Sequence, residues 1–225
     1  DTATNIARVH NANLKEGSSW CALGHLLGVF MGQRLSALPE TLLIEESGVL
    51  PVTESDAIVA SVLAGLAEGL GAVKINSVNS HLWADAQGLR VVLKKNDGVQ
   101  NEQLRLSVET PSSHLQVAGD RAGGEDNIIQ VDDYYFRGHP HEHVLLVPHI
   151  NRPGLIGQVG TLLGEKDVNI AEMVLGYKHQ DRTTALMWMQ DGQPLDRSIS
   201  EESRKLASVL SMEYIHLPIT ESFNF

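Results

Sequence analysis

The spacing of hydrophobic residues predicts alternating helices and strands in the first part of the chain. Apolar side chains recur every three or four residues over 18–35, which predicts a helix whose buried face carries Trp20, Leu23, Leu27, Phe30 and Met31. A strand is expected at 41–46, followed by a helix that Ser55 caps and Gly71 ends. Further strands are expected at 89–93, 104–108, 115–117 and 128–136. Residues 18–137 are therefore expected to form one small α/β layer domain.

The first of these helices carries three glycines, Gly24, Gly28 and Gly32, at four-residue spacing. A glycine inside a helix costs about 1 kcal/mol relative to alanine. The spacing therefore indicates that a sheet or a sister helix approaches this helix closely.

The second part of the chain restarts after a polar joint at 138–143 and follows the order βαββαβ. Strands are expected at 144–147, 170–177, 183–189 and 212–217, and helices at 154–165 and 200–210. This order predicts a four-stranded antiparallel sheet with both helices on one face, a ferredoxin-like module spanning 144–225. The fold class is therefore α+β, with two small domains.

Composition narrows the function classes. The 225 residues carry a formal net charge of −11, which argues against a nucleic-acid partner. No apolar run is long enough to span a membrane. The lone Cys21 cannot form an internal disulfide and fits a reducing, cytoplasmic setting. The chain begins with Asp1 rather than Met, and we expect it to be a fragment of a longer polypeptide.

Motifs for catalysis and nucleotide binding are missing from the sequence. It contains no phosphate-cradling loop, no GxSxG elbow, and no HExxH or CxxC arrangement. We therefore expect no catalytic residue, metal or cofactor in this chain. His139, His141 and His143 alternate and would face one side of an extended chain, but Pro140 disfavours a regular strand, and a solvated hinge is the alternative to a metal site.

The segment from His149 to Gly154 carries the most specific chemical signal. Asn151 is placed to cap a helix that begins with Pro153 and Gly154, and the N-terminus of a helix suits a carboxylate. Asn151 and Asn169 each offer a donor and an acceptor, so together they could bind the ammonium and carboxylate groups of an amino acid. The alternative is that Asn151 only caps the helix and Asn169 only lies in a turn.

An anion site in the first part of the chain is a weaker hypothesis. Arg90, Lys94 and Arg137 are among the cations available to it. Scattered surface charge explains the same residues equally well.

The run from Val144 to Lys178 resembles the ACT domain of D-3-phosphoglycerate dehydrogenases. Three earlier segments resemble the allosteric substrate-binding domain that precedes it in long forms of that enzyme, namely 21–35, 77–91 and 127–136. The resemblance implies that 1–17 is a linker from a missing NAD-dependent catalytic part. It also implies a homodimer or homotetramer, acting with the catalytic domains of the same polypeptide.

The resemblance further implies feedback control by L-serine or a similar small amino acid held between two ACT domains. It assigns effector binding to His149, Asn151 and Asn169, with Gly154 and Leu155 beside them. Two alternatives stay open. One is the β portion of an iron–sulfur L-serine dehydratase, although Trp20 stands where its Ser-Ser-Ser-His segment would place the histidine. The other is a structural oligomerisation module that binds no effector.

Overall fold

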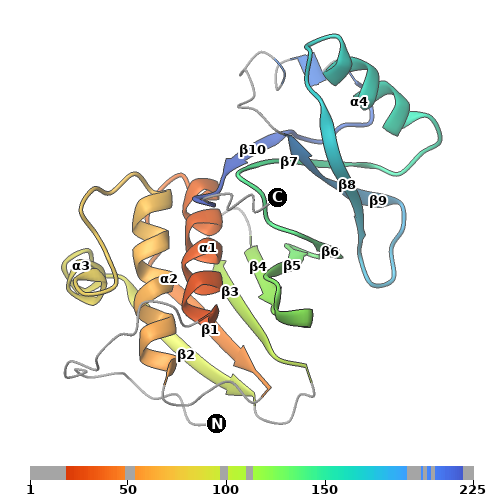
Figure 1. The fold of residues 1–225 in the computed structure, drawn as a ribbon. Coiled ribbons are helices and arrows are strands. Elements are labelled where there is room, and N and C mark those ends of the chain that lie inside the picture. Colours follow the sequence, from red (N-terminus) through yellow and green to blue (C-terminus); the bar gives the residue numbers. More distant parts are fainter. Residues whose placement is uncertain are drawn as a thin grey trace. The chain divides into compact units, whose positions relative to one another are not determined.

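A computed structural model of the chain describes residues 19–48, 54–96, 101–109, 114–191, 199, 202–203 and 206–219. The chain divides into two compact units, Asp1–Asn127 and Ile128–Phe225. Both combine helices with strands, which confirms the α+β class (Figure 1). The division lies before the polar joint expected at 138–143, because the strand Tyr134–Gly138 pairs with a strand of the second unit.

The first unit is a mixed four-stranded sheet with helices on one face (Figure 1). Its elements are α1 (Ser19–Arg34), β1 (Thr41–Ser47), α2 (Ser55–Gly69), α3 (Ser80–Ala86), β2 (Arg90–Asn96), β3 (Gln103–Glu109), β4 (His114–Asp120) and the 3-10 helix η2 (Ala122–Gly124). The strand order is β4-β3-β1-β2, and only the β1–β2 pair is parallel. The short helix α3 was not predicted from the sequence, and its Ser80 hydroxyl donates a hydrogen bond to the carbonyl oxygen of Ala60.

The glycines of α1 allow the backbones of α1 and α2 to touch. A Cβ added at Gly28 would lie 2.8 Å from the amide nitrogen of Leu66, and one at Gly32 would lie 2.6 Å from the carbonyl oxygen of Leu66. On α2, a Cβ added at Gly65 would collide with the carbonyl oxygen of His25. These contacts confirm the predicted close approach of a sister helix.

A buried charge lies at the end of β1. Alternation along this strand turns Leu42, Ile44 and Glu46 towards the core, and Glu46 is 3% exposed. The Ser55 hydroxyl donates to Oε2 of Glu46 at 2.7 Å, and Nζ of Lys95 lies 2.7 Å from that hydroxyl and 3.6 Å from the same carboxylate oxygen. Ser55 is thus the first helical residue of α2 and binds a core carboxylate, so the prediction that it caps the helix is wrong.

The second unit contains β5 (Asn127–Val131), β6 (Tyr134–Gly138), β7 (His143–Ile150), α4 (Leu155–Gly164), β8 (Ile170–Tyr177), β9 (Thr184–Asp191) and β10 (Glu213–His216). Their order is β10-β7-β9-β8-β6-β5, with antiparallel neighbours. The single strand expected at 128–136 is a hairpin, because Asp132 adopts a positive φ of 50° between β5 and β6. The helix expected at 200–210 falls partly outside the described residues. Ile199, Glu202 and Ser203 are helical, but 206–210 are not, because Val209 forms an antiparallel bridge with His149.

The core of this unit lies between α4 and the sheet. Leu155, Val159 and Leu163 line one side of α4 and are each 1% exposed. They pack in one cluster with apolar residues of β7 and β9 and with Ile199 and Met212. No helix in the described part of the chain is long and apolar enough to cross a membrane.

Candidate functional site

The turn from β7 into α4 begins with a buried histidine. Alternation along β7 places His149 on the same face as Leu145 and Val147, which α4 covers, and the side chain is 2% exposed. Its Nδ1 lies 2.9 Å from the carbonyl oxygen of Val147. Because a carbonyl only accepts, Nδ1 carries a proton and donates it in this hydrogen bond, which fixes the orientation of the ring.

Asn151 anchors this turn to the β8–β9 hairpin. Its backbone N–H donates to the carbonyl oxygen of Thr183 at 2.8 Å, and its side-chain amide donates to that of Arg182 at 2.9 Å. The prediction that Asn151 caps α4 is therefore wrong. The helix begins at Leu155, after the expected first positions Pro153 and Gly154, and Gly154 precedes it in a left-handed conformation with φ 84° and no side-chain cap.

The hairpin that receives Asn151 is itself held by a carboxylate. Asp181 accepts hydrogen bonds from the backbone N–H and the hydroxyl of Thr183, at 2.8 Å and 2.5 Å. These bonds, together with a weaker one from Thr184 and the nearby charge of Lys178, lower the pKa of Asp181. The carboxylate is therefore charged at neutral pH and keeps the hairpin in the conformation that Asn151 contacts.

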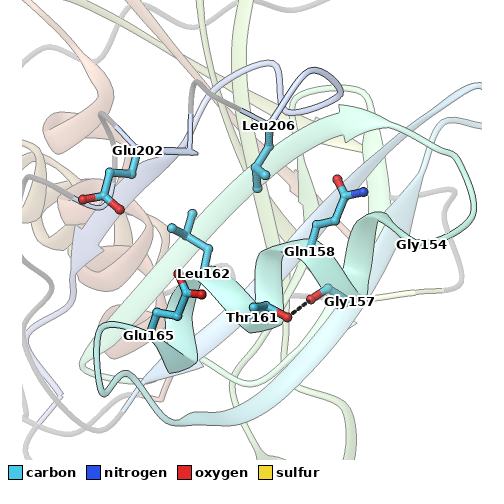
Figure 2. Close-up of a pocket in the computed structure, with 8 residues that line it drawn as sticks. All are labelled: Gly154, Gly157, Gln158, Thr161, Leu162, Glu165, Glu202 and Leu206. Carbon is cyan, nitrogen blue, oxygen red and sulfur yellow. Dashed lines mark hydrogen bonds between the residues drawn. The ribbon is translucent and has the colours of Figure 1, made fainter.

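A groove of about 690 Å³ runs along the outer side of α4 (Figure 2). Its lining residues come from the helix and from the segment that faces it, and they are Gly154, Gly157, Gln158, Thr161, Leu162, Glu165, Glu202 and Leu206. The Thr161 hydroxyl donates to the carbonyl oxygen of Gly157 at 2.9 Å. Gly154 is the only one of these residues that was predicted to belong to a binding site. Glu202 and Leu206, which complete the groove, are remote from it along the chain.

Asn169 lies at the opposite end of the unit from Asn151. It precedes β8, whose Ile170 is opposite Asp191 of β9, whereas Ile150 at the end of β7 is opposite Thr184. Thr184 and Asp191 are the two ends of the same strand, about 23 Å apart for seven residue steps. Within one chain the two asparagines therefore do not converge on one small ligand.

The cations expected to bind an anion lie apart or engage protein groups. Arg90 at the start of β2 donates to the Thr41 hydroxyl at 2.9 Å and 3.1 Å. Lys94 lies further along that strand, 3.9 Å from a carboxylate oxygen of Glu45. Arg137 belongs to β6 in the second unit. An anion site built on these residues stays a prediction.

The three alternating histidines do not gather into one group. His143 joins Glu142 and His216, the one group of three close metal-ligand side chains found among the described residues. His139 and His141 lie in the short stretch between β6 and β7 and are not part of that group. His216 could not be predicted as a member of this group, since 73 positions separate it from His143 and only the pairing of β10 with β7 brings them together.

Comparison with known proteins relates most of the chain to one enzyme family. Residues 17–132 match the family model described as the D-3-phosphoglycerate dehydrogenase intervening domain. The D-3-phosphoglycerate dehydrogenase of Archaeoglobus fulgidus is 26% identical over 219 residues, covering 96% of this chain and 41% of the relative. The D-3-phosphoglycerate dehydrogenase of Synechocystis sp. is 30% identical over 190 residues, covering 83% of this chain and 34% of the relative. The D-3-phosphoglycerate dehydrogenase of Bacillus subtilis is 24% identical over 203 residues, covering 85% of this chain and 37% of the relative. The chain thus spans about two fifths or less of the length of these relatives.

Proposed function

The chain belongs to the D-3-phosphoglycerate dehydrogenase intervening-domain family, and from this premise we propose that it is the regulatory portion of such a dehydrogenase. In this proposal it binds L-serine or a similar small amino acid between two copies of its second unit. The parent enzyme is a cytoplasmic, NAD-dependent member of serine biosynthesis. Its nicotinamide site and catalytic residues lie in a part of the polypeptide that this chain does not contain.

The observation that carries the proposal is the separation of Asn151 from Asn169. Seven residue steps of β9 lie between the ends of the sheet at which they are found, so one amino acid cannot touch both within one chain. In a two-fold dimer whose β8 strands run antiparallel side by side, the start of one β8 lies beside the end of the other. Asn169 of each copy then approaches Asn151 of its partner.

The part of the β8 edge that does not pair with β6 supports this dimer. Among the described residues, β8 pairs with β6 only at Tyr177, which lies opposite Tyr135. An exposed strand edge is a template for pairing with another chain. Met173 on this strand is 36% exposed and Ile156 on α4 is 43% exposed, so apolar side chains are available for an interface.

The strand order supports the assignment of an ACT-type, ferredoxin-like fold to this unit. Its four strands are β7, β8, β9 and β10 in chain order, and α4 follows β7. Across the sheet they lie in the order β10-β7-β9-β8, which is fourth, first, third and second. That arrangement places the N-terminus of α4 next to the turn of His149 and Asn151. The unsatisfied N–H groups of a first helical turn suit the carboxylate of the effector.

Calorimetric titration of the chain with L-serine tests the proposal. We expect saturable heat at one serine per chain and a higher midpoint of thermal unfolding, because a ligand that binds only the folded state stabilises it. D-serine, whose side chain points differently, is the control. An absence of both heat and stabilisation at millimolar L-serine contradicts the proposal and favours a structural oligomerisation module.

A further inference from the structure

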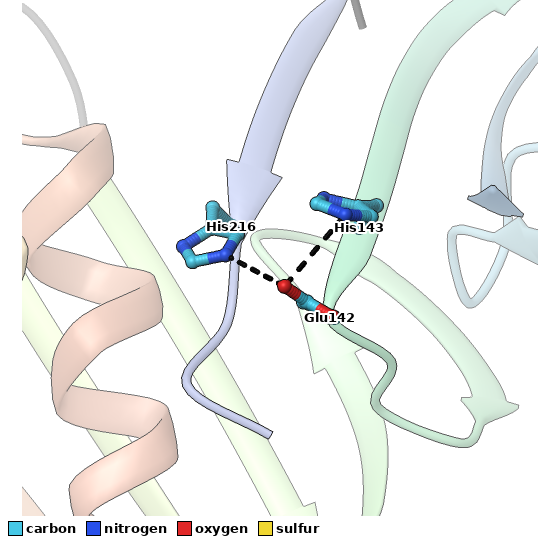
Figure 3. A group of neighbouring side chains, drawn as sticks. All are labelled: Glu142, His143 and His216. Atoms are coloured by element: carbon cyan, nitrogen blue, oxygen red, sulfur yellow. Dashed lines mark hydrogen bonds and ion pairs between the residues drawn. The ribbon is translucent and has the colours of Figure 1, made fainter. Parts of the chain in front are cut away.

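Two histidines and a glutamate meet where β7 and β10 pair at the edge of the second unit (Figure 3). Oε1 of Glu142 lies 3.2 Å from Nε2 of His216 and 3.8 Å from Nε2 of His143. The three ligand atoms all lie within 4.8 Å of one another. Figure 3 shows the two imidazoles on neighbouring strands, with the carboxylate reaching towards both.

The antiparallel pairing of the two strands creates this cluster. His143 and His216 are direct cross-strand partners, so their side chains leave the sheet on the same face, and their ring centroids are 5.4 Å apart. Glu142 lies just before β7 begins and accepts the N–H of Leu217 at its carbonyl oxygen. The cluster therefore joins the first and last strands of this module.

Tyr214 orients the buried member of the cluster. Its hydroxyl is 2.5 Å from Nδ1 of His143, and the two rings stack with centroids 5.9 Å apart. A hydrogen bond at one ring nitrogen fixes the orientation of the ring and leaves the other nitrogen for a metal. In His143 that other nitrogen is Nε2, the atom that faces Glu142.

We propose that Glu142, His143 and His216 bind a zinc ion. Two imidazole nitrogens and one carboxylate oxygen form a ligand set that zinc accepts in proteins, with a water molecule in the fourth position. Two atoms bound to one zinc at 2.0–2.1 Å lie at most about 4.2 Å apart. The contacts of Glu142 with His216 and His143, at 3.2 Å and 3.8 Å, already meet this limit. The side chains of His216 and Glu142 are 54% and 46% exposed, so a change of rotamer can bring the third pair of ligand atoms closer.

Bound zinc would tie the C-terminal strand to the rest of the second unit. It would replace a contact between side chains 74 residues apart with coordinate bonds. Because the unfolded chain does not hold these three groups together, zinc binds the folded state and stabilises it. The ion would lie at the end of β7 remote from His149 and Asn151, two strands away from Ile170, the residue that follows Asn169.

Titration of the untagged, metal-free chain with zinc chloride tests the proposal. We expect one zinc per chain, a higher midpoint of thermal unfolding, and, with cobalt(II) as a substitute, the visible absorption of a four-coordinate site. His216→Ala and Glu142→Gln should each weaken zinc binding by roughly 10-fold or more, at least the cost of losing an outer-shell partner. Both side chains are half-exposed, so these variants should fold, as circular dichroism would verify.

His114→Ala is the matched control. His114 is an exposed histidine 2.7 Å from Glu109, a histidine–carboxylate pair in the first unit that belongs to no three-residue group among the described residues. Its loss should leave zinc binding unchanged. The proposal is overturned if the wild-type chain binds no zinc stoichiometrically, or if the two cluster variants bind zinc as tightly as the control.

Discussion

A Gly28→Ala variant is expected to lose about 2 kcal/mol or more of stability in the first unit, although alanine is the better helix former. The added Cβ would lie 2.8 Å from the amide nitrogen of Leu66 and closer still to the carbonyl oxygen of Val62. Both atoms are backbone, so α1 and α2 would have to separate. Overpacking costs about 1–3 kcal/mol and occasionally more, and two backbone atoms closer than 3 Å put this substitution at or above the upper end of that range. The helix-propensity gain of about 1 kcal/mol therefore leaves a net loss of about 2 kcal/mol or more.

Gly160→Ala on α4 is the matched control, because a Cβ there meets no atom of the described chain within 4 Å. It should stabilise its helix by up to about 1 kcal/mol. Hydrogen exchange followed by mass spectrometry reports each unit separately. Amides of α1 and α2 should exchange roughly 30-fold faster in Gly28→Ala, while those of the second unit are unchanged. If the amides of α1 and α2 exchange equally slowly in Gly28→Ala and in the wild-type chain, the two helices are not in backbone contact.

The second large effect is expected from Asn169→Ala, which should abolish binding of L-serine while leaving the fold intact. Asn169 is exposed and lies in the loop between α4 and β8, so its truncation removes no core contact. Removing one hydrogen-bonding partner of a bound ligand lowers the binding free energy by about 1–3 kcal/mol, and by more where the ligand is charged. For a weakly bound amino acid this loss puts binding beyond detection.

Calorimetry with L-serine measures the loss, and thermal unfolding verifies the fold. Asn101→Ala, a change at an exposed asparagine of the first unit, is the control and should bind serine normally. Serine binding by Asn169→Ala with unchanged affinity would remove Asn169 from the site. Asn151→Ala should also lose binding, with a modest cost in stability because its amide holds the β8–β9 hairpin.

The spacing of apolar residues correctly predicted the helices and strands that bury a continuous face. Roles assigned from residue type alone were wrong where tertiary contacts compete for the same side chain. The helix α1 and strands β1 and β8 lie where their apolar spacing placed them. Asn151 has the residue type of a helix cap, but the β8–β9 hairpin offers one carbonyl oxygen to its side-chain amide and another to its backbone N–H, and Gly154 precedes the helix instead. The sequence did not reveal the hairpin of β5 and β6, since Asp132 and Asp133 interrupt an otherwise apolar run by only two residues.

The residues proposed for the amino-acid site, Asn169 included, could be named from the sequence, but only those close in sequence could be placed together. His149, Asn151 and Gly154 share one turn, and a family resemblance identified them. Their distance from Asn169 depends on strand register, which the order of elements does not contain. The pairing of His143 with His216 has the same origin. Residue types therefore suggested the chemistry, while the sheet decided which groups can act together.

Mixing two defective variants tests most directly whether an amino-acid site is shared between two copies of the chain. Asn151→Ala and Asn169→Ala, each unable to bind serine alone, are combined in equal amounts and allowed to exchange subunits. Half of the resulting dimers are mixed and carry one intact site, so L-serine binding should return to about a quarter of the wild-type stoichiometry at wild-type affinity. If the mixture binds no serine although mass spectrometry shows mixed dimers, the site is not shared and the account is contradicted.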